Sequence, residues 1–197
     1  MKQKSKNLGG RPKSFDPEAV LDAAVRVFWE KGYEGASMDD LTKAMNINRP
    51  SLYATFGNKR GLFLKALDRY TAVQGSAQAE PLRKVADIRQ AIAEYYREII
   101  RTVCSADGPC GCLIASVATE VAERDPDVKQ KISTNLKRSQ DFLDKRLKDS
   151  GDYDGRLSGA VILSAGMSLA QRARLGASKA ELSAIAQGYI EFFFPTQ

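Results

Sequence analysis

Hydrogen-bonding and basic side chains recur from Arg49 onwards, at positions that would share one side of a short helix. The guanidinium of Arg49 is always charged and can donate two hydrogen bonds to the edge of one guanine. Ser51 and Tyr53 carry hydroxyl groups that suit phosphate oxygens. Ala54 and Thr55 carry methyl groups that can touch the methyl of thymine. This combination favours contact with duplex DNA over catalysis.

Two short predicted helices would hold this segment in place. Ser37, with Asp40 close behind it, nearly matches a capping box, which marks the start of the first helix. Asn46 tolerates the left-handed backbone of a turn, and Asn48 can cap the second helix. Two helices joined by such a turn make a helix-turn-helix, whose second helix enters the major groove. The side chains that would face inward and fix the angle between the helices are Ile47, Leu52 and Phe56.

The rest of the chain also has helical periodicity, so the sequence predicts an all-α protein. A first helix begins after Asp16 and ends at Gly32, and a fourth is capped by Asn58 and runs through Tyr70. Gly75 and Pro81 suggest a looser connection over 75–87. The further helices expected are 88–104, 112–123, 127–149, 154–175 and 179–194.

The positive charge is concentrated in the first third of the chain. Residues 1–70 hold 13 Lys/Arg and 8 Asp/Glu, whereas residues 71–197 hold 17 and 16, within a total net charge of +6. A polyanionic partner explains such asymmetry. The basic arm, 1–14, either follows DNA phosphates or the minor groove, or is a tail that only raises non-specific affinity. The alternative function is therefore a non-specific architectural DNA-binding protein, which would bind without sequence preference.

Several classes of protein are disfavoured by composition. The sequence contains no histidine, so it lacks the usual general base at neutral pH and the commonest metal ligand. We expect no enzyme activity, no cofactor and no metal. The basic N-terminus is followed by no apolar signal region, and no apolar run is long enough to cross a membrane. A cytoplasmic protein that does not associate with membranes is expected.

Residues 15–67 resemble the DNA-binding domain of the tetracycline-repressor (TetR) family of bacterial regulators. The motifs that carry the resemblance are Ala24…Phe28…Gly32-Tyr33, Ser37-Met38-Asp39-Asp40-Leu41, the run from Pro50 to Lys59, and Leu62-Phe63. The resemblance implies a repressor with a helix-turn-helix domain (15–72) and a helical ligand-binding and dimerisation domain (73–197), responding to an unknown small-molecule effector; activation stays open. The predicted DNA-contacting residues are Ser37, Met38, Arg49, Pro50, Ser51, Tyr53, Ala54, Thr55 and Lys59.

The last two predicted helices have the composition of a close helix interface. Residues 157–174 are rich in glycine, alanine and serine, which let helices approach closely, and the final helix has a broad apolar face. In the TetR family, these helices pair with those of a second subunit as a four-helix bundle. A homodimer would read a palindromic operator, with half-sites about 34–36 Å apart. The alternative is that both helices pack only within one subunit.

The three cysteines, Cys104, Cys110 and Cys112, have no disulfide-scaffold pattern. Cys112 lies near a predicted helix start, where a thiol has a lowered pKa and is more nucleophilic. Cys110 or Cys104 would then resolve it as a disulfide after oxidation. Thiol-based sensing is one hypothesis and soft-metal binding by three thiolates is a weaker one. The favoured interpretation is that these are small buried residues, as free cysteines usually are. Tyr95, Tyr96 and Phe142 either line a small-molecule pocket or belong to the core.

Overall fold

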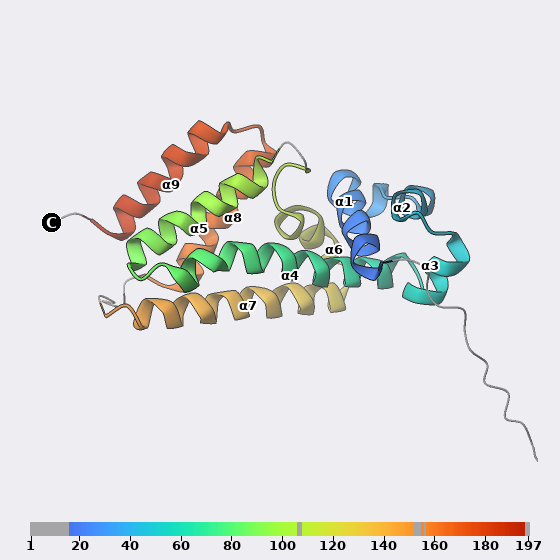
Figure 1. Ribbon diagram of the computed structural model, residues 1–197, viewed down its shortest axis with the longest axis horizontal. Coiled ribbons are helices and arrows are strands. Elements are labelled where there is room, and N and C mark those ends of the chain that lie inside the picture. Colours follow the sequence, from blue (N-terminus) through green and yellow to red (C-terminus); the bar gives the residue numbers. More distant parts are fainter. Residues whose placement is uncertain (1–15, 106–107, 152–154, 156, 196–197) are drawn as a thin grey trace, which may run out of the picture.

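The computed structural model describes residues 16–105, 108–151, 155 and 157–195, and these are helical without any strand (Figure 1). The predicted all-α class is confirmed, while the predicted basic arm, 1–14, lies outside the described residues. In chain order the elements are α1 (Pro17–Gly35), α2 (Met38–Met45), α3 (Arg49–Phe56), α4 (Lys59–Lys84), α5 (Ile88–Val103), the π-helical turn η1 (Ile114–Ala118), α6 (Thr119–Ala122), α7 (Pro126–Lys148), α8 (Gly159–Arg174) and α9 (Lys179–Phe193).

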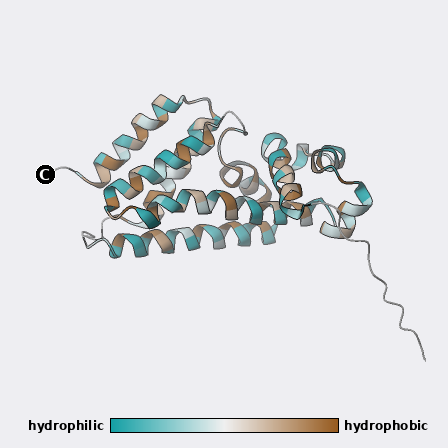
Figure 2. Ribbon diagram, in the orientation of Figure 1, coloured by the Kyte–Doolittle hydropathy of each residue, from teal (hydrophilic) through white to brown (hydrophobic). Residues whose placement is uncertain are grey.

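Two hydrophobic cores lie at opposite ends of α4. The first buries Phe28, Leu41 and Phe63 where α1, α2 and α3 pack around the start of α4, a unit called the head below. The second is built mainly by α5, α8 and α9, with Tyr96 fully buried in it. Figure 1 shows α4 running from one end to the other with α7 alongside. In Figure 2, teal and brown alternate along the helices, as expected when each helix buries one face.

The predicted capping residues act as predicted in and around the head. The side chain of Asp16 accepts a hydrogen bond from the Glu18 N–H at 2.9 Å, and Ser37 accepts one from the Asp40 N–H at 3.0 Å. Asn48 and Asn58 accept from residues three positions later, each at 2.8 Å. These caps satisfy N–H groups that have no partner inside their helices, which fixes where each helix begins.

The prediction of a looser connection over 75–87 is wrong as far as Lys84. Helix α4 is continuous from Lys59 to Lys84 and includes both Gly75 and Pro81. Pro81 lacks an N–H and so removes one hydrogen bond, but Leu82 beside it is 2% exposed within the second core. Burial of this turn outweighs the low helix propensity of the two residues. The expected boundary between the two domains, at 72 and 73, therefore falls inside a helix.

Three other boundaries also differ from expectation. Gly32 leaves helical geometry, with φ of 76° and ψ of 172°, but one further turn follows to Gly35. The helix expected over 112–123 is divided into η1 and α6, and ends at Ala122. The helix expected from 154 begins at Gly159, because Ser158 caps it; residue 154 itself lies outside the described residues.

Two glycines of α4 provide a matched test of packing in the head. A Cβ atom on Gly61 would lie 2.1 Å from the carbonyl oxygen of Phe56, whereas a Cβ on Gly75 would meet nothing within 4 Å. We expect Gly61→Ala to lower the free energy of unfolding by about 1–3 kcal/mol, since backbone must move. Gly75→Ala should raise it by about 0.5–1 kcal/mol, because the unfolded chain loses freedom. Thermal melts at equal protein concentration test this, and equal shifts for both variants would contradict it.

Candidate functional site

The turn between α2 and α3 is held by local hydrogen bonds. Asn46 has φ of 49°, the left-handed conformation expected at the end of α2. At the start of α2, Ser37 and Asp40 form a complete capping box. Lys31 of α1 also donates to the Asp40 carboxylate, so α1 and α2 are tied together. These hydrogen bonds from Lys31 and then Ser37 lower the pKa of Asp40 to about 2. The carboxylate is therefore charged throughout the physiological range.

One side of α3 is anchored and the other faces solvent. Leu52 is fully buried in the core of the head, whereas Tyr53 is 47% exposed. Five of the nine predicted DNA-contacting residues are exposed and four are half-buried. The exposed ones are Ser37, Arg49, Pro50, Tyr53 and Ala54, and the half-buried ones are Met38, Ser51, Thr55 and Lys59. The helix thus presents a polar surface whose position is fixed by the apolar residues behind it.

Arg49 is already engaged by an acidic neighbour across the turn. Its guanidinium donates to the Asp39 carboxylate of α2 at 2.8 Å. The hydrogen bond and charge of Asp39 raise the pKa of Arg49. Both side chains are largely exposed, at 54% and 80%, so water and salt weaken this ion pair. Arg49 can therefore exchange Asp39 for another acceptor while staying on the same surface.

Three of the other predicted contacts have structural roles in the head. The Ser37 hydroxyl is used in the cap, and Met38 packs against the core of the head. Lys59 donates to the backbone carbonyl of Glu34 at 3.3 Å and lies 4.8 Å from the centre of the Tyr33 ring. The ammonium group of Lys59 is thus placed where α1 ends and α4 begins. Their role toward DNA stays a prediction.

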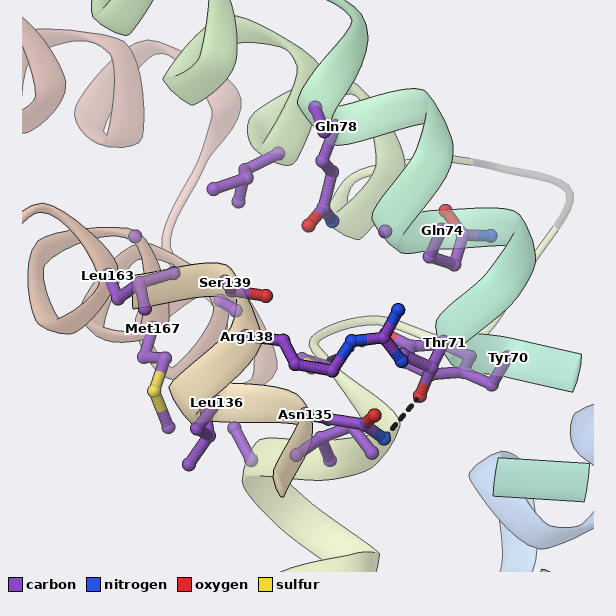
Figure 3. Close-up of a pocket in the computed structure, with 18 of the residues that line it drawn as sticks. Tyr70, Thr71, Gln74, Gln78, Asn135, Leu136, Arg138, Ser139, Leu163 and Met167 are labelled. Carbon is purple, nitrogen blue, oxygen red and sulfur yellow. Dashed lines mark hydrogen bonds between the residues drawn. The ribbon is translucent and has the colours of Figure 1, made fainter. Parts of the chain in front are cut away.

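A pocket of about 560 Å³ lies between α4, α5, α7 and α8, toward the second core (Figure 3). One part of its wall is polar and comes from α4 and α7. The residues of this part include Thr71, Gln74, Gln78, Asn135, Arg138 and Ser139. Another part is apolar and includes Ile99, Leu163 and Met167. The space has the size and mixed lining of a small-molecule site.

The three aromatic residues expected to line a pocket or belong to the core all pack in or against the second core, and two of them also line the pocket. Tyr95 lines the pocket, as does Phe142. Tyr96 is fully buried and donates its hydroxyl to the Ile162 carbonyl at 3.0 Å. Burial raises the pKa of both tyrosines, so both stay neutral.

Cys112 belongs to the wall of the same pocket. The backbone at Gly111 has φ of 89°, and a Cβ there would lie 3.0 Å from the Cβ of Arg174 in α8. Only glycine fits this approach, which brings Cys112 inward, half-buried between the two cores. The Tyr70 hydroxyl donates to its sulfur at 3.3 Å. Cys110 is exposed, and burial raises the pKa of Cys104, followed by the effect of the nearby Cys110.

Polar contacts along α4 and α7 connect this pocket with the head. Arg60, at the start of α4, pairs with both Asp125 and Asp127 at the start of α7. Hydrogen bonds from Arg60 lower the pKa of Asp125. Further along the same pair of helices, Lys131 pairs with Asp68. These contacts, together with a hydrogen bond from Asn135 to Thr71 at 3.3 Å, are called the α4–α7 seam below.

Comparison with known proteins identifies the family. Residues 20–66 match the family model described as bacterial regulatory proteins of the tetR family. The chain is 35% identical to the HTH-type transcriptional repressor ComR of Escherichia coli K12 over 146 residues, which are 72% of this chain and 70% of that protein. It belongs to the TetR family of transcriptional regulators.

Other relatives of this TetR-family chain agree with that assignment. It is 34% identical over 149 residues to YezE of Bacillus subtilis 168, an uncharacterized HTH-type transcriptional regulator, covering 74% and 77% of the two chains. A solved structure of the TetR-family regulator CifR, a cysteine mutant with 26-base-pair operator DNA, superposes with a TM-score of 0.81 at 30% identity, covering 92% and 98%. The chain is accordingly a regulator rather than an enzyme. No helix within the described residues is long and apolar enough to cross a membrane.

Sequence reasoning missed several partners that only the fold brings together. Asp39 lies on α2, one helix before Arg49. The short separation of the two opposite charges across the turn was the available signal that they could pair. Arg60 and Asp125 are far apart in sequence, and nothing local connects them. Arg138 is one of many charged residues on α7, and only its place at the pocket distinguishes it.

Proposed function

We propose that this TetR-family regulator is a ligand-responsive repressor that binds a palindromic operator as a homodimer in the cytoplasm. The observation that carries the proposal is the exposed polar face of α3, held on buried Leu52 with Arg49 at its first turn. The nine predicted residues would contact DNA, with Arg49 reading a base edge and Tyr53 a phosphate. ComR is named a transcriptional repressor, and CifR was solved with operator DNA, which supports this direction.

The proposed division of labour follows the two cores. The head, within 15–72, reads DNA, and 73–197 bind the effector and dimerise, while the arm 1–14 adds affinity for phosphates. Because α4 crosses the boundary without a break, it carries any shift of the second core to the head. The α4–α7 seam would make the two helices move together.

The proposed dimer uses α8 and α9. Val161 is 44% exposed and Phe192 is 82% exposed on these helices. Between them lies a shallow apolar depression that also includes Ala160, Ser164 and Tyr189. Exposed aromatic and branched side chains gathered on a helix pair favour burial against an identical surface, which a two-fold axis provides.

The proposed effector site is the pocket beside α4. A ligand that fits the pocket better in one arrangement of α4 than in another shifts the population toward that arrangement. If the distance between the two heads in that arrangement does not match the operator, the ligand lowers the affinity for the operator. By linkage, the operator then lowers the affinity for the ligand by the same factor. Thr71, Gln74 and Gln78 of α4 line the pocket, so ligand contacts act directly on this helix.

A second candidate signal is oxidation of Cys112, whose sulfur lines the pocket and accepts a hydrogen bond from the Tyr70 hydroxyl. The thiolate is the form of a cysteine that attacks a peroxide. Attack transfers one oxygen to sulfur as a sulfenic acid and releases water or an alcohol from the peroxide. Condensation with Cys110 or Cys104 would then release water and form a disulfide, which a reductant reverses.

The test is selection of bound duplexes from a random pool at physiological salt, repeated with hydrogen peroxide and then with a reductant. We expect a palindromic consensus from the reduced protein. If Cys112 senses oxidants, peroxide abolishes enrichment, reductant restores it, and Cys112→Ser no longer responds to peroxide. Steeply salt-dependent binding without any consensus would contradict the proposal in favour of an architectural DNA-binding protein. Enrichment that peroxide leaves unchanged would contradict oxidant sensing by the three cysteines.

A further inference from the structure

The charges around the pocket are unbalanced. Its charged wall residues are Asp68, Arg83 and Arg138. The Asp68 carboxylate is paired with Lys131, and the charge of Arg83 acts on the nearby Glu80 carboxylate, whereas Arg138 has no acidic partner among the described residues. We propose that the effector is a small amphipathic organic anion, with a carboxylate or sulfonate group attached to an apolar body, and that Arg138 binds the anionic group. This inference rests on the proposal that this pocket is the effector site.

The anionic group of the ligand would lie between α7 and α4. In Figure 3, Arg138 extends from α7 toward α4, and Gln78 points from α4 toward the same space. Within the described part of the chain, the side chains of Arg138, Gln74 and Gln78 make no hydrogen bond. A guanidinium presents its N–H donors in a planar fork that matches the two oxygens of a carboxylate. The amide N–H groups of the two glutamines can donate to the same oxygens.

The body of the ligand would lie against the second core. Ile99, Leu163 and Met167 form an apolar wall there, and Leu163 and Met167 are only half-buried without a ligand. Arg83 adds to the positive potential of the pocket, with its guanidinium carbon 5.6 Å from the centre of the Phe142 ring. A ligand whose apolar body covers this wall removes apolar surface of both partners from water. Its anionic group would stay near the open side of the pocket, where Arg138 is exposed.

Ligands of other charge fit these groups less well. A cation would meet two guanidiniums and an Asp68 already engaged by Lys131. A neutral apolar molecule would gain the apolar wall but would use neither arginine. The charge of the pocket therefore selects for anions, and the apolar wall selects against small hydrophilic ones such as phosphate.

The test uses two fluorescent probes that share one aromatic body. Anilinonaphthalene sulfonate carries an anionic group and phenylnaphthylamine carries none, and the fluorescence of both increases in apolar surroundings. We expect the full-length wild type to bind the sulfonate about tenfold more tightly than the neutral probe. Arg138→Gln should weaken sulfonate binding about tenfold and change binding of the neutral probe less than about twofold, since only the charged contact is lost. Arg138→Lys should retain part of the preference. Arg97→Gln, which removes the same charge outside the pocket, should bind both probes as the wild type does.

Three results would overturn the anion site: equal affinity of the wild type for both probes, no saturable binding of the sulfonate, or unchanged sulfonate binding by Arg138→Gln. Retained binding of the neutral probe by Arg138→Gln shows that the variant is folded. Operator titrations with and without saturating sulfonate separate this inference from the proposed function. An anion that binds through Arg138 without changing operator affinity keeps the site and removes the effector role. A chain that binds no specific operator fails the proposed function independently of either probe.

Discussion

Arg49→Ala is expected to lower operator affinity about a hundredfold while leaving affinity for random DNA within a few-fold of the wild type. A bidentate contact from arginine to guanine contributes about 1–3 kcal/mol of discrimination against the wrong base. A dimer makes the contact twice, once in each half-site, so the loss is doubled in free energy. Non-specific affinity depends on the sum of phosphate contacts and changes little when one arginine is removed.

The measurement is a titration of labelled operator and of a scrambled duplex at one salt concentration. Arg97→Ala is the matched control, because it removes the same charge on α5 and should bind both duplexes as the wild type does. Unchanged discrimination by Arg49→Ala would contradict the assignment of α3 as the recognition helix. An equal loss on both duplexes would make Arg49 a phosphate contact instead.

Asp39 gives this result a second readout. Its carboxylate, 80% exposed, now accepts from Arg49 and would lie beside DNA phosphates in a complex. Its charge opposes DNA binding in general, while its hydrogen bond orients Arg49 toward one side of α3. Asp39→Asn should therefore raise the affinity for random DNA and lower the ratio of operator affinity to random-DNA affinity.

The positions where the helices of the head begin were predictable because their causes are local. Asp16, Ser37, Asn48 and Asn58 each accept a hydrogen bond from an N–H two or three residues later. The left-handed turn at Asn46 depends on the same residue that the sequence pointed to. No information from distant parts of the chain is needed for any of these features.

The second half of α4 was not predictable in this way. Gly75 and Pro81 have low helix propensity, and a local reading ends the helix near them. The helix continues because Tyr70 and Leu82 are buried, at opposite ends of the stretch, in two different cores. Tertiary burial therefore decides where this helix ends. In the proposed mechanism, the continuity of α4 is also what would let a ligand in the pocket influence the head.

The candidate sites also differ in whether their residues could be predicted from local sequence. The exposed face of α3 follows from helical periodicity, so Arg49 and Tyr53 could be selected from the sequence. The pocket does not, since Arg138 and Gln78 come from α7 and α4, and only the packed fold brings them to one space. Cys112 lies between these cases: its position near a helix start was recognisable from the sequence, but its contact with Tyr70 was not.

Phe192→Asp is expected to convert the dimer to a monomer and to lower operator affinity by about 10²–10⁴-fold. Phe192 is 82% exposed on α9, next to Phe193 with ring centres 6.0 Å apart. An aspartate there would place one carboxylate from each subunit in the proposed interface, and burying unpaired charge is strongly unfavourable. The folded monomer should lose little stability, because the replaced ring is already in solvent.

Val73→Asp on α4 is the matched control, since Val73 is 42% exposed but lies outside the α8 and α9 surface. Light scattering after gel filtration should find this variant dimeric and Phe192→Asp monomeric. The operator titration then tests the link between assembly and function. Each head contacts only a few base pairs, so one half-site binds weakly, and the partner subunit makes the second contact effectively intramolecular. If Phe192→Asp stays dimeric with unchanged operator affinity, the dimer must use another surface. If it is monomeric yet binds the operator as tightly as the wild type, one head suffices and the palindromic operator is wrong.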